Sequence, residues 1–241
     1  MKLDVLAIGS HPDDVELGCG GTLALLAKQG KKVGILHLTR GERGTRGTVE
    51  ERQQEAEDAG KALGASEVGF LDCGDGAFRT GEAEEDALIE RLRAWQPDLV
   101  LAPSPGDRHP DHHRSHQLVQ SASFYAGLRN RHPEGGPPYR PGAVFSYMQH
   151  DLFEPSFIVD VSSVWETKLE ALRAYRSQLY QAGAGEKKAE TKVSSREFWL
   201  AVEGRARHFG LLINVELGEP FWSRVPLAVA DLSTIIPGGL R

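Results

Sequence analysis

Short apolar runs alternate with longer amphipathic stretches through the first half of the chain. The runs have the continuous apolar character of strands buried on both faces, and the longer stretches have helical spacing. The predicted strands are residues 3–8, 32–38, 68–71 and 99–102, and the predicted helices are residues 15–29, 48–63 and 82–95. This alternation predicts an α/β, Rossmann-like fold in three layers, with a mostly parallel sheet and helices on both faces.

The carboxyl ends of two of these strands are expected to meet. In the common strand order 3-2-1-4, the strands at residues 3–8 and 99–102 are neighbours, and the chain winds away from them in opposite directions. Ligands bind outside the carboxyl ends of the strands at such a switch point. The sequence therefore predicts a ligand site where the segments after these two strands come together.

The pattern changes after residue 128, where residues 129–141 are rich in Pro, Gly and Arg and predict a surface loop. The predicted elements beyond it are strands at 142–148 and 156–161 and helices at 162–179 and 197–209. Residues 181–195 are polar and are expected to be mobile. No stretch has the composition of an interdomain linker, so residues 1–241 are expected to form a single domain.

Composition excludes several classes of protein. The net charge of −6, from 28 basic and 34 acidic residues, argues against a nucleic-acid-binding protein that depends on phosphate neutralisation. The two cysteines, Cys19 and Cys73, predict no disulfide framework and fit a reducing compartment. No apolar run approaches the roughly 20 residues that span a bilayer, and the N-terminus lacks a signal-peptide pattern. We expect a cytoplasmic globular protein with neither a nucleic-acid nor a membrane partner.

The segment after the first predicted strand, Gly9-Ser10-His11-Pro12-Asp13-Asp14, carries the first candidate chemistry. His11 and Asp14 are three residues apart, so a tight turn can direct both toward one point, and Asp13 between them must point elsewhere. This is the geometry of a metal ion with a free carboxylate beside it. Asp13 is then the candidate base. In isolation, the same residues would serve as a turn and a helix N-cap.

A second cluster, His109-Pro110-Asp111-His112-His113, follows the strand at residues 99–102. Proline favours a helix that starts just after His109, so His112 would project from the first turn and His109 would lie in the preceding loop. A catalytic zinc site keeps three protein ligands and a water. His112 could supply the third ligand, His109 an acid, and Asp111 a carboxylate that orients one imidazole.

Other histidines and one glycine-rich segment favour structural interpretations. His112 and His116 are one helical turn apart and form a competing metal pair, although His113 and His116 are expected to be structural or exposed. His37, His132, His150 and His208 have no partner motif and are also expected to be structural. The segment Gly18-Cys19-Gly20-Gly21 lies too far from the first strand to bind a dinucleotide, so it predicts close helix packing with Cys19 as a buried filler.

Two loops at the same predicted edge offer substrate contacts. Residues 39–48 combine glycines with Arg40, Arg43 and Arg46, and guanidinium groups suit hydroxyls or a carboxylate. Arg52, one turn into the next helix, could reach the same cleft or pair with a glutamate on the helix surface. Asp75 lies in a turn after the third strand, where its carboxylate could hold sugar hydroxyls.

These motifs resemble those of the LmbE/PIG-L family of zinc-dependent N-acetylglucosamine deacetylases. Residues 10–14 are similar to the family's Ala-His-Pro-Asp-Asp, and residues 109–112 match its His-Pro-Asp-His. The roles that the resemblance implies are zinc ligation by His11, Asp14 and His112, general-base catalysis by Asp13, acid catalysis by His109 with support from Asp111, and substrate binding by Arg52 and Asp75. Ferrous iron would suit the same two imidazoles and carboxylate.

Residues 108–112, 157–161 and 169–178 resemble the bacillithiol-pathway branch, which removes acetate from N-acetylglucosaminyl malate. The resemblance implies a homo-oligomeric N-deacetylase, and Arg108 would favour an anionic aglycone. Where that branch shows aromatic-Ala-Glu-Gly-Phe, this chain has Leu217-Gly218-Glu219-Pro220-Phe221, which leaves the C-terminal contacts to the aglycone open. Chitooligosaccharides and a mycothiol-type inositol conjugate remain alternative substrates, and a non-catalytic sugar- or metal-binding protein remains an alternative class.

Overall fold

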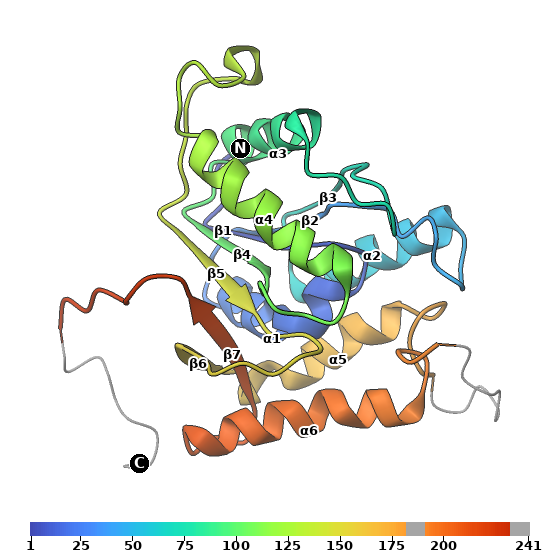
Figure 1. The fold of residues 1–241 in the computed structure, drawn as a ribbon. Coiled ribbons are helices and arrows are strands. Elements are labelled where there is room, and N and C mark those ends of the chain that lie inside the picture. Colours follow the sequence, from blue (N-terminus) through green and yellow to red (C-terminus); the bar gives the residue numbers. More distant parts are fainter. Residues whose placement is uncertain (182–190, 232–241) are drawn as a thin grey trace.

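The strands of the chain form one mixed sheet in the order β3-β2-β1-β4-β5-β7-β6 (Figure 1). The computed structural model describes residues 1–181 and 191–231. The strands are β1 (Val5–Gly9), β2 (Val33–His37), β3 (Glu67–Phe70), β4 (Leu99–Pro103), β5 (Ala143–Tyr147), β6 (Phe157–Asp160) and β7 (Gly218–Ser223). The first five strands are parallel, and β7 runs antiparallel to β5 and β6. The predicted order of the first four strands is confirmed.

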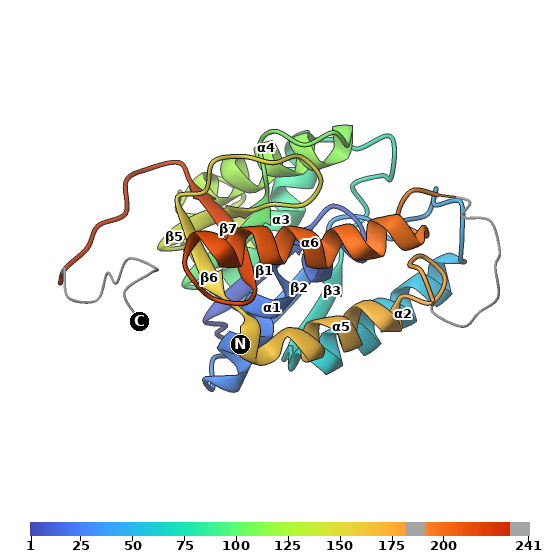
Figure 2. The same cartoon turned by 90° about the horizontal axis from the view of Figure 1, so that it is seen from below.

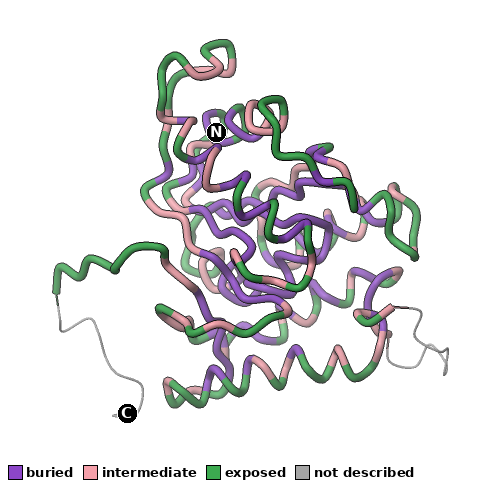
Figure 3. The backbone as a smooth tube through the Cα atoms, viewed as in Figure 1, coloured by how far each residue is buried: buried purple, intermediate pink, exposed green. Residues whose placement is uncertain are grey.

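Helices cover both faces of the sheet, as the sequence predicts (Figures 1 and 2). One face packs against α1 (Asp14–Lys28), α2 (Val49–Leu63), α5 (Trp165–Ala174) and α6 (Arg196–Leu212), and the other against α3 (Glu82–Trp95) and α4 (Pro110–Tyr125). In β1, Val5 and Ala7 enter the first core, whereas Leu6 and Ile8 enter the second. The buried backbone in the middle of Figure 3 follows these central strands.

The local signals at α1 and α2 act as predicted. Thr48 caps α2 by accepting a hydrogen bond from the backbone N–H of Glu51, and the Glu51 carboxylate accepts one from the N–H of Thr48. The glycines of α1 permit close packing, since a Cβ at Gly18 would lie 2.2 Å from Cδ2 of Tyr147. Cys19 is fully buried between these contacts.

Two predictions in the C-terminal part were wrong. The helix predicted at 162–179 is a 3-10 turn at Ser162–Val164 followed by α5, which ends at Ala174. Strand β7 was not predicted, because Gly218, Glu219 and Pro220 interrupt its apolar pattern. The expectation of mobility for residues 181–195 falls largely outside the described residues. Within the part of the chain that the structure describes, no helix is long and apolar enough to cross a membrane.

The pairing of β1 with β4 positions the functional segments. These strands are parallel neighbours, with Val5 opposite Leu99 and Ala7 opposite Leu101. The segments that follow them therefore leave the sheet at the same edge. Helices α1 and α4 both begin there, so their first turns face each other across the sheet edge.

Candidate active site

Asp14, in the first turn of α1, contacts the imidazoles of both sequence motifs. Its Oδ2 lies 3.3 Å from Nδ1 of His11, and its Oδ1 lies 3.2 Å from Nε2 of His112. Oδ2 also accepts a 2.8 Å hydrogen bond from the backbone N–H of His11, and Oδ1 accepts one from Nε2 of Gln149. All four side chains are buried. The fold thus brings His112 into contact with the pair His11 and Asp14, which lies about a hundred residues earlier in the sequence.

The far nitrogen of each imidazole faces another carboxylate. Nε2 of His11 lies 3.3 Å from Oδ2 of Asp111 and 3.4 Å from Oδ1 of Asp75. Nδ1 of His112 lies 3.1 Å from Oδ1 of Asp107. Histidines that bind metal usually donate their second N–H to such a group, which fixes the tautomer and the ring orientation. The donor set therefore fits zinc or ferrous iron between the two inner nitrogens and Asp14.

In the described part of the chain, the groups of residues that have one ligand atom each within 4.8 Å of one another do not include Asp14, whose two oxygens contact different imidazoles. These groups are His11 with His109 and His112, Asp107 with His112 and His150, and His11 with Asp75 and Asp111. We favour the Asp14 arrangement because, among the described residues, Asp14 is the carboxylate in contact with both imidazoles. The carboxylates of Asp75, Asp107 and Asp111 face the ring nitrogens that point away from Asp14.

The carboxylates of the cluster favour protonated imidazoles in the metal-free protein. Burial lowers the pKa of His112, but Asp14 and Asp107 outweigh this effect and raise that pKa to about 9. Burial likewise opposes protonation of His11, and hydrogen bonds with Asp111 and Asp14 nevertheless hold its pKa well above the usual value. A metal ion must be bound by neutral imidazole, so metal binding here would release protons.

Asp13 lies beside this cluster with a strained backbone conformation and a raised carboxyl pKa. Its φ of +102° is in the left-handed region, which costs a non-glycine residue about 1–3 kcal/mol. Within the described chain, no hydrogen-bond donor reaches its carboxylate. Burial and the neighbouring charge of Asp14 raise the pKa of Asp13 to about 7. A free carboxylate with this pKa suits general-base catalysis near neutral pH.

His109 occupies the N-cap of α4. Its Nδ1 accepts a 3.2 Å hydrogen bond from the backbone N–H of Asp111, so the neutral ring carries its proton on Nε2. Burial and the charges of His11 and His112 lower the pKa of His109. The Asp111 carboxylate faces His11, and Asp111 contacts His109 through its backbone. His109 is therefore placed to donate a hydrogen bond from Nε2.

A pocket of about 240 Å³ opens over the cluster. Its lining includes the proposed ligands, the proposed catalytic carboxylate and imidazole, and the predicted contacts Arg52, Asp75 and Arg108. Arg52 is buried and donates from Nη1 to the Gly41 carbonyl at 2.8 Å and from Nη2 to the Pro12 carbonyl at 3.0 Å. The alternative of a helix-surface ion pair for Arg52 was wrong, because the arginine points inward and supports the first motif.

Sequence reasoning missed three residues of this site: Asp107, Gln149 and His150. Oxygens of Asp107 accept hydrogen bonds from the backbone N–H groups of His109 and His150, each at 3.0 Å. The His150 ring stacks on His112 with centroids 5.6 Å apart, and burial lowers the pKa of His150 to about 4. His150 was expected to be structural because it has no partner motif, and the structure places its ring in the lining of the candidate site. The position of Asp107 two residues before His109 was the available signal.

Comparisons with known proteins agree with this geometry. The model of the PIG-L family, described as GlcNAc-PI de-N-acetylase, matches residues 6–123. A diacetylchitobiose deacetylase of Thermococcus kodakarensis is 34% identical in an alignment of 188 residues that covers 72% of this chain and 69% of the relative. The crystal structure of the conserved protein TT1542 from Thermus thermophilus superposes with a TM-score of 0.85 and 37% identity, covering 95% of this chain and 98% of the other.

Two further relatives are named for different activities. A probable N-acetyl-α-D-glucosaminyl L-malate deacetylase of Bacillus cereus is 30% identical over 74% of this chain and 84% of its own length. A 4-oxalmesaconate hydratase of Pseudomonas putida is 30% identical over 72% of this chain and 73% of its own length. The two motifs, the strand order and these similarities show that the chain belongs to the PIG-L/LmbE family of N-deacetylases.

Proposed function

We propose that the protein removes the acetyl group from an N-acetylglucosaminyl conjugate in a zinc-dependent hydrolysis. The observation that carries this proposal is the arrangement around Asp14: two buried imidazoles converge on it, and the adjacent Asp13 carboxylate is left without a hydrogen bond. That combination provides a metal site and a base, and the backbone turn that carries two of the proposed ligands also carries the base. A non-catalytic binding protein would have no need for a strained, unpaired carboxylate there.

When bound, zinc would supply Lewis-acid activation of a water molecule and of the acetamide carbonyl. Asp13 accepts the proton of the attacking water. His109 donates a hydrogen bond from Nε2–H to the oxygen that becomes negative in the tetrahedral intermediate. Asp13 can then return its proton to the amine nitrogen as the C–N bond breaks and acetate leaves. Acid catalysis by His109, which the family resemblance implies, would require Nδ1 to give up its hydrogen bond from Asp111 and become protonated.

Two exposed arginines of the pocket support an anionic aglycone. The carboxylates of Asp13, Asp14 and Asp75 line the pocket as well, and Arg52 is engaged with two backbone carbonyls. Arg43 and Arg108 remain exposed in the lining. A guanidinium binds a carboxylate with two parallel hydrogen bonds, so these side chains favour N-acetylglucosaminyl malate over a neutral disaccharide. The Bacillus relative supports the same substrate, whereas the Thermococcus relative supports diacetylchitobiose as the alternative.

The test is acetate release by zinc-loaded protein from N-acetylglucosaminyl malate, diacetylchitobiose and the inositol conjugate of N-acetylglucosamine. We expect the malate conjugate to give the highest kcat/KM. Arg43→Gln should lower that value about tenfold by weakening a charge-assisted contact. Arg40→Gln is the matched control, because Arg40 pairs with Asp72 outside the pocket. Absence of acetate from every conjugate, together with hydration of 4-oxalmesaconate, would overturn the proposal in favour of a hydratase.

A further inference from the structure

A second, larger cavity lies next to the catalytic pocket, between α6 and the loop that follows β5. Its volume is about 500 Å³, roughly twice the 240 Å³ of the catalytic pocket. Ligand sites for small molecules typically have volumes of about 300–1,000 Å³. The catalytic pocket is below this range and the second cavity is within it. The volume of the catalytic pocket thus suits the reacting sugar and a small aglycone such as malate, and the second cavity could hold a larger group.

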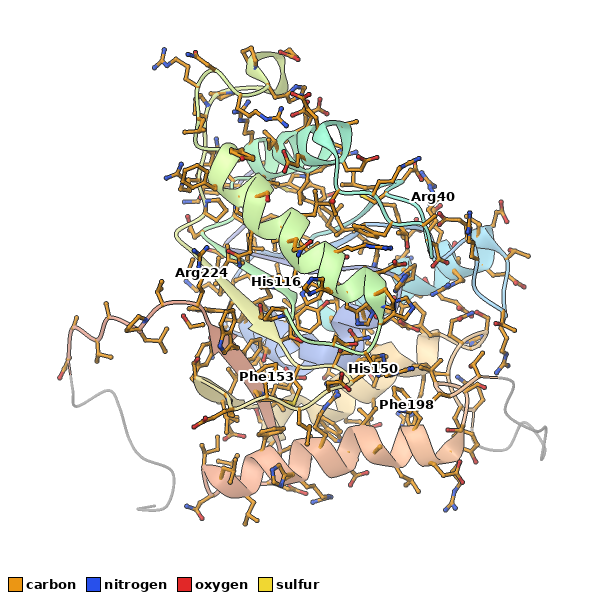
Figure 4. All side chains as sticks on the ribbon, in the orientation of Figure 1. Arg40, His116, His150, Phe153, Phe198 and Arg224 are labelled. Carbon is orange, nitrogen blue, oxygen red and sulfur yellow. The ribbon has the colours of Figure 1, made fainter. Side chains whose placement is uncertain are left out.

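The two cavities share a wall. Gln149 and His150 line both of them. The His150 ring contacts His112 on the catalytic side, and on the other side it lies 5.9 Å from the ring of Phe198. Figure 4 shows His150 and Phe198 close together between the loop and α6. A substrate bound at Asp14 therefore needs to extend only past the His150 side chain to enter the second cavity.

The lining of the second cavity is largely apolar but carries net positive charge. Leu152, Phe198, Ala201 and Val202 supply its apolar surface. Its charged side chains are Lys192, Arg205 and the exposed Glu197, which add up to one positive charge.

Arg205 is the charged group best placed to hold an anion. It donates a 2.9 Å hydrogen bond from Nη2 to the Leu17 carbonyl, and in the described part of the chain no carboxylate forms an ion pair with it. The charges of Glu219 and Asp107 act on this half-buried guanidinium from a distance, but no carboxylate of the described residues is in direct contact with it on the side of the apolar surface. Such a combination is complementary to an apolar group that ends in an acidic function.

We propose that this cavity is a substrate subsite for a flexible apolar group that ends in a carboxylate. The proposal rests on the proposed N-deacylation at the adjacent pocket and adds a second determinant of specificity to it. The same chemistry could come from two parts of a substrate: the aglycone of the sugar, or an N-acyl group longer than acetyl. In either case, binding in the cavity should raise kcat/KM without changing the reacting groups.

Two series of substrates separate these sources. The first keeps N-acetyl and varies the aglycone from methyl to hexyl to carboxyhexyl. The second keeps a methyl aglycone and varies the N-acyl group from acetyl to hexanoyl to adipoyl. Burial of about two methylene groups is enough for a tenfold effect, so we expect at least that gain from the alkyl chain in one series. The carboxylate should add about another tenfold through Arg205.

Variants on α6 then test the location. Ala201→Trp should fill the cavity and abolish the gain of the long substrates, while activity on the methyl N-acetyl substrate stays unchanged. Leu200→Trp is the matched control, because the neighbouring Leu200 is 52% exposed and lies outside the lining. Arg205→Gln should remove only the gain from the carboxylate, with Arg207→Gln as its control, since Arg207 pairs with Glu203 and Glu216 at the surface.

The outcomes distinguish this proposal from the proposed function. Acetate release from the methyl substrate without a gain in either series would overturn the subsite and leave the deacetylase intact. A gain that survives Ala201→Trp would also overturn it. If no substrate is hydrolysed, calorimetric titration with the carboxyhexyl N-acetylglucosaminide and with methyl N-adipoylglucosaminide still decides. Binding of either compound that is lost in Ala201→Trp but kept in Leu200→Trp supports the subsite, and absence of binding by both compounds refutes it.

Discussion

Helix α1 takes part in two buried polar clusters that differ in how well their groups are satisfied. The cluster at its N-terminus contains His11, Asp13 and Asp14. The second cluster lies at Gly21 and Thr22, where the helix meets Glu219 of β7 and Lys168 of α5. Both clusters contain charged groups that are costly to bury, so the comparison shows what each burial achieves.

The second cluster is fully hydrogen-bonded. Glu219 Oε1 accepts from the Gly21 N–H at 2.9 Å and from Lys168 Nζ at 2.6 Å. Its Oε2 accepts from the Thr22 N–H at 2.7 Å and from Thr22 Oγ1 at 2.6 Å. Lys168 also donates to the Leu17 carbonyl at 3.1 Å. The segment around Glu219 therefore joins β7 to α1 and α5 inside the core, and it does not contribute to the substrate pocket.

The first cluster leaves polar groups unsatisfied. The carboxylate of Asp13 has no donor among the described residues, and its backbone is strained. Nε of Arg52 and Oε1 of Gln149 are buried without a hydrogen-bond partner in the described structure. Proteins tolerate such defects mainly at functional sites, where a substrate or ion completes the contacts. The difference indicates that the cluster at the N-terminus of α1 serves catalysis, whereas the cluster around Glu219 stabilises the fold.

The largest expected effect is a loss of kcat when Asp13, in the cluster at the N-terminus of α1, is replaced. Asp13→Asn removes the base without changing the shape of the side chain, so kcat should fall about 10²–10⁴-fold. Zinc content, measured by atomic emission, should stay near that of the unmodified protein. A kcat within a few-fold of the original would show that Asp13 is not the base.

The same variant gives a pH test with a defined sign. The pKa of Asp13 is raised to about 7 in the folded, metal-free protein, compared with 3.8 for an ordinary aspartate. Its contribution to stability is therefore complete below about pH 4 and is lost as the pH rises through 7. After chelation of metal, Asp13→Asn should be more stable than the unmodified protein at pH 8, and this advantage should shrink at pH 5. Thermal unfolding at the two pH values measures it.

A substitution in the cluster around Glu219 should lower stability and leave kcat nearly unchanged, the opposite of the effect of Asp13→Asn. Glu219→Gln leaves the buried Lys168 ammonium without its charge partner, which should lower the free energy of unfolding by about 3–5 kcal/mol. The kcat of the protein that remains folded should be nearly unchanged. Glu216→Gln is the matched control, because Glu216 is an exposed residue of the same segment and pairs with Arg207. Urea unfolding and acetate release, measured on the same samples, separate stability from activity.

A smaller effect is expected from the carboxylates behind the imidazoles. Asp107→Asn removes the charge that faces Nδ1 of His112, and loss of such a partner typically weakens metal binding 10–100-fold. Asp98→Asn is the control, since Asp98 forms an exposed ion pair with Lys2. Competition with a zinc-selective chelator measures the affinity. Equal affinities for the two variants would argue against His112 as a ligand.

The smallest effect is expected at the partly exposed charge cluster around His132. A hydrogen bond from His132 to Glu90, with the nearby charges of Asp86 and Glu134, raises the pKa of His132. This contribution to stability is present below pH 6.5 and is lost as the pH rises through the higher folded pKa. His132→Gln should reduce stability at pH 6 by less than about 1 kcal/mol and by less still at pH 9. A larger loss at pH 9 than at pH 6 would contradict this assignment.

The meeting of the two histidine motifs at the N-terminus of α1 was predictable from the sequence, whereas several residues around them were not. The apolar runs before His11 and His109 fix two parallel strands, and strand order brings the histidines together. Asp107 and His150 escaped prediction because their partners depend on how loops fold back after β4 and β5. The sequence left the role of the segment around Glu219 open, and only the tertiary structure shows that Lys168 pairs with Glu219 in the core.

Strand β7 also has a consequence for how the molecule is assembled during synthesis. It lies between β5 and β6, although it follows both in the sequence. In the described sheet, β6 is hydrogen-bonded only to β7, so β6 has no place in the sheet until residues 218–223 have been made. The nascent chain can thus form β1 to β5 early, while the side of the sheet next to α6 closes last. A chain that ended just before Gly218 would consequently lack the partner of β6, so both β6 and β7 would be missing from the sheet.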